Sequence, residues 1–413
     1  TKQKIAMMNT MIRKFPKSSL TTDANLEIAN TYMADEQFRD AIPYLNNVIQ
    51  SDVNATIKAI AKLKLGTAYY NNDENENALK QFKEIVSQYP NSLQAEDALD
   101  NIKTIYIEDG KPDEYASYMR EIGRPLNADV EDGLTYDAAE KYFDDQKLNE
   151  AINAFNSYLQ KFPQGAHVLD AHNNLAEIYN TKKDWDRALQ HYDYIVNNAP
   201  NQYAERAMLV AGRISFFEKK NYAAAERYYT QLKELTTSQE NKLEAMRGIL
   251  RSQYQLQKWA DALQNAKDLT AAKGSSADDK ALANMAIAKS LEASGQYAEA
   301  ITNFKSVIQL NKAGLAAEAR YGIANGYFEL NKLKDAEKAA METINKSGSY
   351  DYWITKAYIL IGEIYFKEKD YFNAKATLQS VVENTLNPEL KAEAQAKLNE
   401  VIAEESKSSK LNN

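Results

Sequence analysis

A single position recurs every 36 to 38 residues along almost the whole 413-residue chain. It is alanine at every occurrence except one, which Tyr115 fills. The full series is Ala41, Ala78, Tyr115, Ala151, Ala188, Ala225, Ala262, Ala300, Ala336 and Ala374. A fixed period of this length is typical of architectures in which one unit cannot bury its own apolar face and stacks on copies of itself. The period therefore favours one elongated repeat array over two or three compact domains.

Each repeat has the pattern of two helices joined by a turn. Ala171, Leu175 and Tyr179 lie four residues apart and share one face of a first helix, while Ala188 and Tyr192 share one face of a second. Most repeats also keep a small residue seventeen positions before the recurring position and an aromatic residue nine before it. The sequence thus predicts an all-α solenoid of about ten helix hairpins.

These recurring positions resemble the sequence pattern of the tetratricopeptide repeat family. That pattern has a small residue and a tyrosine in the first helix and an alanine between aromatic residues in the second. The resemblance implies a right-handed α-solenoid that serves as a non-catalytic protein-interaction scaffold. The repeats are longer than the family's usual length of about 34 residues and end in sequences such as Tyr89-Pro90 and Phe162-Pro163. In this they are similar to members of the bacterial cell envelope, namely the outer-membrane assembly lipoprotein and the Tol–Pal-associated periplasmic proteins. That likeness implies a periplasmic or outer-membrane-associated location, with the cytoplasm as the alternative.

Helix-breaking residues and a polar C-terminal end predict the boundaries between segments of the chain. The sequence Gly-Arg-Pro-Leu-Asn at 123–127 interrupts the pattern, so we expect a boundary there. The expected segments are N-terminal repeats over residues 1–122, a main array with a C-terminal capping helix over 123–404, and a disordered tail over 405–413. Two pairs at capping-box spacing, Ser275 with Asp278 and Thr237 with Glu240, predict the starts of first helices.

Residues 1–16 match a second helix whose first helix is absent, because Phe15 and Pro16 align with Tyr89 and Pro90. We therefore expect an excised segment, with any targeting signal upstream. An open apolar face on this helix would allow association with other molecules. The residues expected on that face are Ile5, Met8, Met11 and Phe15.

Composition limits the classes of partner. The net charge of −8 argues against nucleic acid or an anionic membrane surface, since both favour clustered Lys and Arg. No apolar stretch approaches the length that spans a bilayer. The absence of Cys excludes disulfides, and the three histidines, His167, His172 and His191, lack the spacing of a zinc motif. No nucleophile elbow or phosphate loop is present, so we expect no cofactor, no metal and no enzymatic activity.

Binding is expected in the groove lined by first helices. In the tetratricopeptide family the groove positions fall about fifteen and eleven residues before the recurring alanine, where this chain has Arg247, Arg251 and Lys289. Together with Asn325, these residues resemble the clamp by which some family members hold a peptide carboxylate. The predicted ligand is an acidic peptide or a peptide C-terminus. The alternative is an ordinary solvated polar face.

Aromatic residues eight positions before the recurring position form a second candidate for the groove. They are Phe143, Phe217, Tyr254 and Phe328, with Tyr70 and Phe366 in the same column. Helix packing explains them equally well. Two functions follow: a scaffold for an extended peptide or partner helix, or a glycan or cell-wall binder that uses the aromatics, with Trp353 as a further candidate. Binding that weakens as salt is added would indicate the peptide or helix scaffold, because dissolved ions screen charges.

Overall fold

The structure is a computed structural model that describes residues 2–311 and 313–411, and within these residues every regular element is a helix. The first helices of the repeats are α2 (Leu20–Ala34), α4 (Ala55–Tyr70), α6 (Leu93–Glu108), α8 (Ala128–Asp144), α10 (Val168–Thr181), α12 (Ala204–Arg213), α14 (Gln239–Gln255), α16 (Ala277–Ala293), α18 (Gly314–Glu329), α20 (Asp351–Lys367) and α22 (Pro388–Leu411). The second helices are α1 (Lys2–Lys14), α3 (Phe38–Gln50), α5 (Asn75–Gln88), α7 (Pro112–Glu121), α9 (Leu148–Lys161), α11 (Trp185–Asn197), α13 (Tyr222–Leu235), α15 (Trp259–Ala271), α17 (Tyr297–Leu310), α19 (Leu333–Lys346) and α21 (Tyr371–Asn384). The π-helical turn η1 (Ile214–Glu218) extends α12. The predicted all-α repeat solenoid is confirmed.

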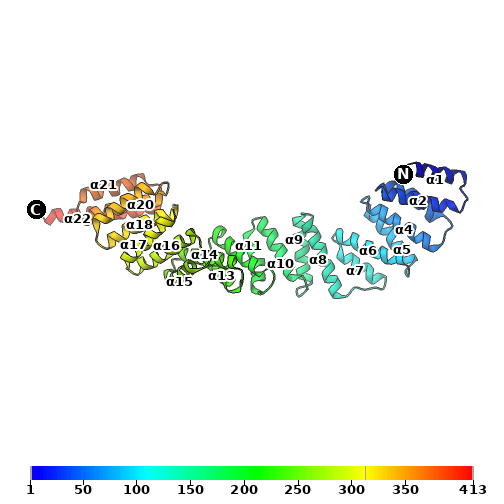
Figure 1. Cartoon of the computed structure of the whole chain (residues 1–413), viewed down its shortest axis with the longest axis horizontal. Coiled ribbons are helices and arrows are strands. Elements are labelled where there is room, and N and C mark those ends of the chain that lie inside the picture. The colour runs from blue at the N-terminus through cyan, green and yellow to red at the C-terminus, as the bar shows by residue number, and fades with distance from the viewer. Residues whose placement is uncertain (1, 312, 412–413) are drawn as a thin grey trace. The chain divides into compact units, whose positions relative to one another are not determined.

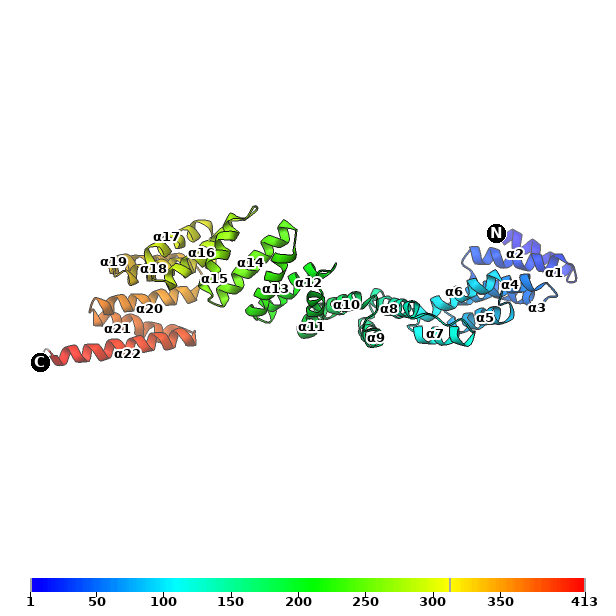
Figure 2. The same cartoon turned by 90° about the horizontal axis from the view of Figure 1, so that it is seen from below.

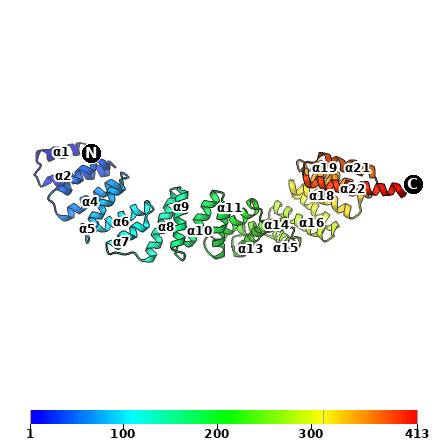
Figure 3. The ribbon, with the colours of Figure 1, turned by 180° about the vertical axis from the view of Figure 1, so that it is seen from behind.

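The chain divides into two compact units, residues 1–182 and 183–413. Within each unit the helices follow one another in chain order (Figure 1). In the first unit this order runs through α2, α4, α6 and α8 (Figure 3). The boundary expected near residue 123 lies inside this unit, where α7 packs on both α6 and α8.

The hairpins close with one recurrent backbone geometry. In most turns between a first and a second helix, a residue other than glycine adopts a positive φ, between 50° and 65°. The residues are Glu36, Asp73, Gln146, Lys183, Lys220, Gln257, Asn331 and Lys369, and Gly110 and Gly295 take the same place in two other repeats. A left-handed residue after a helix lets its amide satisfy one of the last carbonyl groups, as Glu36 does with Met33. The same turn geometry therefore sets the angle between the helices of each hairpin.

The recurring alanine lies in the buried core of each hairpin that has it. All nine alanines of the series are buried, with at most 1 % of their surface exposed. An aromatic ring four residues later fills the space beside them in several repeats, for example Phe82, Phe155 and Phe304, each fully buried. The facing first helix makes room for such a ring with a glycine at Gly66 and at Gly322. Ring and glycine therefore form one packing unit.

Replacing Gly66 by alanine should lower the free energy of unfolding of the first unit. The new Cβ would lie 2.4 Å from a ring carbon of the buried Phe82, and such overpacking costs about 1–3 kcal/mol. The gain in helix propensity offsets up to about 1 kcal/mol, which leaves a net loss of up to about 2 kcal/mol. Gly133 is the matched control, because it lies inside α8 and a Cβ added there would meet no neighbouring side chain or other helix within 4 Å. Gly133→Ala should therefore stabilise the unit in urea unfolding; two variants with the same sign would contradict this packing account.

Helix α1 packs on α2, and one of the residues expected on its open face is buried: Ile5 is 8 % exposed. The exposed large apolar side chains of this region are Met7 and Phe15. The open apolar face is therefore smaller than the sequence pattern suggests, because the Ile5 side of the helix already faces its neighbour. Association through this helix stays a prediction.

Helix α22 extends the capping helix beyond its expected end. It continues to Leu411 and covers residues 405–411, for which the sequence predicts a disordered tail; residues 412 and 413 lie outside the described residues. Lys375 of α21 binds both carboxylate oxygens of Glu405 at 2.6 and 2.8 Å, and Ser406 bonds back to the Ile402 carbonyl. These hydrogen bonds hold the C-terminal end of α22 in place. Because they are polar, the low apolar content of residues 405–411 does not predict them.

Candidate functional site

The first helices form the inner side of the second unit. Each contacts the next first helix in the series α12, α14, α16, α18, α20 and α22, whereas contacts between consecutive second helices are at most marginal in the described part of the chain. In a curved stack, the row of helices that lie closer together is the concave one. The order of α16, α18, α20 and α22 can be followed in Figure 2. We call the side chains that these helices and α14 present away from the second helices the inner face.

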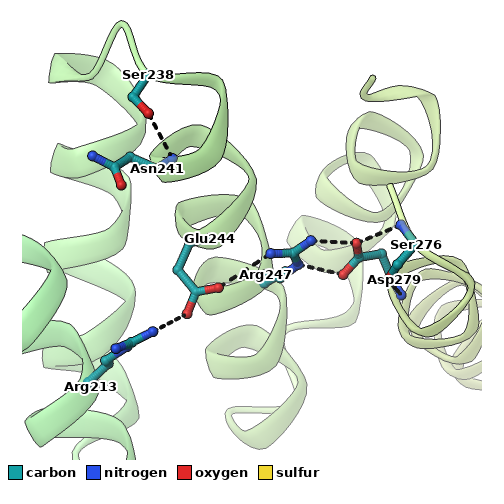
Figure 4. Close-up of polar contacts among 7 residues, drawn as sticks. All are labelled: Arg213, Ser238, Asn241, Glu244, Arg247, Ser276 and Asp279. Carbon is teal, nitrogen blue, oxygen red and sulfur yellow. Dashed lines mark hydrogen bonds and ion pairs between the residues drawn. The ribbon is translucent and has the colours of Figure 1, made fainter. Parts of the chain in front are cut away.

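Arg247 on α14 lies in a chain of ion pairs that links three first helices (Figure 4). Its guanidinium donates two hydrogen bonds to Asp279 of α16, at 2.6 and 2.8 Å, and a third of 3.4 Å to Glu244. Glu244 in turn accepts from Arg213 of α12 at 3.3 Å. The bond to Asp279, followed by the charges of Asp279 and Glu244, raises the pKa of Arg247. Both arginines are therefore neutralised by carboxylates of the protein.

A capping box fixes Asp279 in place. The Ser276 hydroxyl accepts from the Asp279 amide at 3.1 Å, and the Asp279 carboxylate accepts from the Ser276 amide at 2.9 Å, so two of the amides at the start of α16 are satisfied. The hydrogen bond from Arg247 lowers the pKa of Asp279 to about 2. The box lies one residue later than the predicted pair of Ser275 and Asp278. Ser238, likewise one residue later than Thr237, caps α14.

Lys289 on α16 is also neutralised. Its ammonium lies 3.1 Å from Glu292 and 3.7 Å from Glu318 of α18. Asn325 of α18 donates to the same Glu292 at 3.1 Å. The Tyr254 hydroxyl of α14 reaches across to Glu318, and burial together with that carboxylate raises the pKa of Tyr254. Three first helices thus meet in one hydrogen-bonded network.

The predicted carboxylate clamp is wrong in its physical premise. It required Arg247, Arg251 and Lys289 to lack local acidic partners, but Arg247 and Lys289 are each paired with two carboxylates. Arg251 is exposed and forms no ion pair with a described residue, and Asn325 belongs to the Lys289 network. Arg247 and Lys289 therefore hold neighbouring repeats together, and a ligand role for Arg251 stays a prediction.

The predicted aromatic residues differ from one another in environment. Tyr254 is held by its hydrogen bond to Glu318, and Phe143 and Phe328 are partly buried. Phe217, in the π-helical turn, is exposed, and its ring packs edge-on against Phe216 with centroids 4.8 Å apart. Three of the four proposed aromatic side chains are therefore at least partly buried in the protein. Of these four, Phe217 alone is largely exposed.

An aromatic cluster, of which the sequence analysis named only Trp353, lies where α18, α20 and α22 meet. The Tyr321 and Trp353 rings pack with centroids 5.6 Å apart, and Tyr352 packs edge-on against Trp353. Lys356 lies over the Tyr321 ring and pairs with Glu393 of α22 at 2.7 Å. Burial, followed by neighbouring glutamates of which Glu393 is the first, raises the pKa of Tyr321.

A second ion pair joins α20 and α22 beside this cluster. Lys397 lies 2.9 Å from Glu363 and 3.8 Å from Glu400. The three lysines of α16, α20 and α22 therefore face five glutamates; the set is Lys289, Lys356, Lys397, Glu292, Glu318, Glu363, Glu393 and Glu400. Among these residues of α16, α18, α20 and α22 the negative charges outnumber the positive ones, and Lys289 is the one member of the predicted basic section in the set.

The described residues lack two kinds of site. They contain no group of His, Asp or Glu arranged to hold a metal ion. None of their helices combines the length and the apolar character needed to cross a membrane.

Solved structures with similar arrangements are repeat solenoids of low sequence identity. The P58(IPK) TPR domain is 16 % identical and aligns over 93 % of this chain and 99 % of its own, with a TM-score of 0.33. Yeast Tom70 is 12 % identical over 94 % and 96 % of the two chains, with a TM-score of 0.37. PilW, described as a type IV pilus biogenesis factor, is 16 % identical over 52 % and 93 %, with a TM-score of 0.32. No curated protein sequence matches this chain.

Family models match most of the chain. A tetratricopeptide repeat-like domain model matches residues 1–114. Tetratricopeptide repeat models match residues 136–203 and 285–351, and another matches 356–384. These matches cover both units and fall on the same helix hairpins that the 37-residue period marks, so the chain belongs to the tetratricopeptide repeat family.

Proposed function

We propose that this chain is a non-catalytic scaffold that binds an extended peptide or a partner helix on the inner face of its second unit. The observation that carries the proposal is the excess of carboxylates over lysines on α16, α18, α20 and α22, beside the aromatic cluster of Tyr321, Tyr352 and Trp353. Tetratricopeptide repeats generally mediate contacts between proteins, which supports this class of function.

The charges of the inner face favour a cationic ligand. On α16, α18, α20 and α22 the three lysines Lys289, Lys356 and Lys397 are each already paired with a glutamate, whereas Glu318 and Glu400 share a lysine with a second glutamate. A Lys or Arg of a bound peptide would relieve this excess through charge-assisted hydrogen bonds. The proposed ligand is therefore a peptide rich in Lys and Arg.

A glycan binder is the second candidate. Sugars stack on open aromatic faces, but Trp353 packs against Tyr321 on one side and meets Tyr352 on another. Tyr352 is the most open ring of this cluster, at 39 % exposed. The charge excess therefore favours the peptide over the glycan, and salt dependence separates the two, since only the peptide complex weakens as ions screen the charges.

A displayed library of random peptides, selected on the whole chain and released with high salt, tests the proposal. Enriched peptides should be rich in Lys and Arg. Their affinity should fall about fivefold in Glu393→Gln, because one charge-assisted contact is worth about 1 kcal/mol at a partly exposed site. Glu342→Gln is the matched control: Glu342 also pairs with a lysine, Lys346, but lies on a second helix, α19. Equal losses in the two variants, or no enrichment of basic residues, would refute the proposal.

We also propose a location in the bacterial cell envelope, periplasmic or associated with the outer membrane. The support is the long repeat period with its Tyr-Pro and Phe-Pro endings, as in Tyr89-Pro90 and Phe162-Pro163. Fractionation of the source cells with an antibody against the chain tests it. Recovery in the cytosolic fraction would refute this location without bearing on the peptide site.

A further inference from the structure

The second helix of the third repeat, α7, ends one turn early. The second helices from α3 to α21 otherwise end nine or ten residues after the recurring position, whereas α7 ends at Glu121, six residues after Tyr115. Gly123, with a φ of 76°, lets the next amide, that of Arg124, donate back to the Met119 carbonyl at 2.8 Å. A left-handed glycine at this place ends a helix. The third repeat therefore lacks the last turn of its second helix.

A hollow of about 550 Å³ lies where this shortened end meets the end of α5 and the start of α6. Apolar side chains form part of its lining, and three charged residues also line it; the two sets are Val86, Leu99 and Ile122, and Lys83, Glu121 and Arg124. Hollows of similar volume, about 560 and 590 Å³, lie against α21 and α15, so volume alone does not mark a binding site. What distinguishes the hollow of α5, α6 and α7 is the pairing of its polar groups.

The lining residue Tyr118 has two counterparts, because tyrosine also lies three residues after the recurring position at Tyr44 and Tyr228. The Tyr44 hydroxyl exchanges hydrogen bonds of 3.0 and 3.2 Å with Asn9, and the Tyr228 hydroxyl donates to Asp193 at 2.6 Å. Both partners lie thirty-five residues earlier, on the preceding second helix. A tyrosine at this position is therefore ordinarily satisfied by the neighbouring repeat.

Tyr118 has no such bond, because the residue thirty-five positions before it is Lys83. The Lys83 ammonium lies 4.8 Å from the centre of the Tyr118 ring and donates instead to the Tyr106 hydroxyl at 2.7 Å. Tyr118 is only 9 % exposed, yet its hydroxyl forms no hydrogen bond with a described residue. Burial, followed by the charge of Glu121, raises the pKa of Tyr118 to about 12. This hydroxyl therefore keeps its proton at neutral pH and lacks an acceptor.

Two opposite charges line the hollow without pairing. Lys83 and Glu121 form no ion pair with each other or with any other described residue, whereas Arg124 lies 2.8 Å from Glu96. The charged residues that directly adjoin the lining in the chain are Glu84, Glu96 and Arg120, each with an ion-pair partner, and the exposed Asp100. A simple anion would satisfy Lys83 but would be repelled by Glu121. A molecule that carries a carboxylate and an ammonium group close together satisfies both.

We propose that the hollow of α5, α6 and α7 binds a free α-amino acid with a bulky apolar side chain. The carboxylate of the amino acid accepts hydrogen bonds from the Lys83 ammonium and the Tyr118 hydroxyl. Its α-ammonium group donates to Glu121, and its side chain packs on Val86 and Leu99. The volume of the hollow lies in the range of small-molecule sites. The site belongs to the first unit and the inner face to the second, so neither proposal depends on the other.

Binding of leucine to the whole chain, followed by saturation-transfer NMR, tests the proposal on the unaltered protein. Leucinamide lacks the carboxylate, and N-acetyl-leucine lacks the ammonium group. Each should bind about tenfold more weakly than leucine, because each leaves one charge of the hollow without its charge-assisted hydrogen bond. Glycine, which has both charges but no apolar side chain, should also bind about tenfold more weakly.

Three variants assign the contacts one by one. Lys83→Met keeps the side-chain stem over the tyrosine rings and should lower leucine affinity about tenfold without weakening leucinamide. Tyr118→Phe removes the hydroxyl alone and should lower leucine affinity about fivefold. Glu121→Gln should abolish the preference for leucine over N-acetyl-leucine. Because Glu121 is exposed, this last variant stays informative even if the other two fold poorly.

The chain supplies a matched control for each of the first two variants. Lys305 donates to Tyr327 at 3.3 Å as Lys83 does to Tyr106, but the place of Tyr118 in that repeat is taken by Ala339. Lys305→Met should therefore leave leucine binding unchanged. Tyr44→Phe should do the same, because the Tyr44 hydroxyl is already bonded within the protein.

Several results would overturn the proposal. They are no leucine binding at millimolar concentration, equal binding of leucine and leucinamide, and equal losses in Lys83→Met and Lys305→Met. A peptide that ends in leucine and binds as tightly as leucine itself would assign the hollow to the end of a protein chain and refute the free amino acid. Unchanged discrimination against N-acetyl-leucine in Glu121→Gln would refute the contact to the ammonium group.

Discussion

Replacing Asp279 by alanine is expected to lower the free energy of unfolding of the second unit by about 3 kcal/mol. The carboxylate is almost fully buried, accepts two hydrogen bonds from Arg247 and completes the capping box of α16. Its removal leaves a partly buried guanidinium with Glu244 alone and frees an amide at the helix start. Breaking a buried pair costs about 3–5 kcal/mol, and the partial exposure of Arg247 places this case at the lower end.

Urea unfolding followed by the fluorescence of Trp259, in the neighbouring helix α15, measures this effect. Asp278→Ala is the control, since Asp278 is adjacent, also acidic and exposed, and accepts one exposed hydrogen bond from Asn311. It should cost no more than about 0.5 kcal/mol. Equal effects would show that the ion-pair chain is not structural, and Arg247 would again be a candidate for ligand binding.

Acidification from pH 6.5 to 4 is expected to destabilise the second unit by about 3 kcal/mol through His191. This side chain is buried in α11, and burial lowers its pKa from 6.5 to about 4. The folded state therefore holds the neutral ring while the unfolded chain takes up a proton below pH 6.5. Stability from this group is complete above pH 6.5 and falls until the folded state also protonates near pH 4. Each pKa unit is worth about 1.4 kcal/mol.

The measurement is the pH dependence of urea unfolding, followed by Trp185 in the same helix, for wild type and His191→Gln. The variant cannot protonate at this position, so its loss between pH 6.5 and 4 should be smaller by about 3 kcal/mol. Asp279, whose pKa is lowered from 3.8 to about 2, starts to lose its contribution only near pH 4, and it does so equally in both proteins, so it cancels in the comparison. Parallel pH profiles for the two proteins would show that His191 is not held neutral by the fold.

The repeat architecture could be predicted because each repeat contains its own pattern. The recurring alanine, the aromatic four residues later and the small residue of the first helix all act within one hairpin, so a single period reveals them. The start of α16 shows where such local information ends. The sequence Ser-Ser-Ala-Asp-Asp at 275–279 allows two capping boxes. The later one forms because only Asp279 also meets Arg247 of the preceding repeat.

The candidate site was predicted in position but not in pairing. Arg247 and Lys289 do lie on first helices, as their place in the repeat indicates. Each has one partner on its own helix, but the other partner, Asp279 for Arg247 and Glu318 for Lys289, comes from the next repeat. Glu244 and Glu318 both lie eighteen positions before the recurring alanine. Comparing that column with the basic residues of neighbouring first helices would have revealed the ion pairs. The aromatic cluster of Tyr321 and Trp353 depends on the approach of α18 and α20, which no single repeat encodes.

Site-specific crosslinking is the most direct test of the claim that the inner face of the second unit binds basic peptides. A photoreactive amino acid replaces Asn325 on the first helix α18, or Phe372 on the second helix α21. Each protein is irradiated with a labelled Lys- and Arg-rich peptide from the salt-released selection. Crosslinking at position 325, suppressed by high salt and absent at position 372, is the predicted result; crosslinking at 372 with none at 325 would contradict the account.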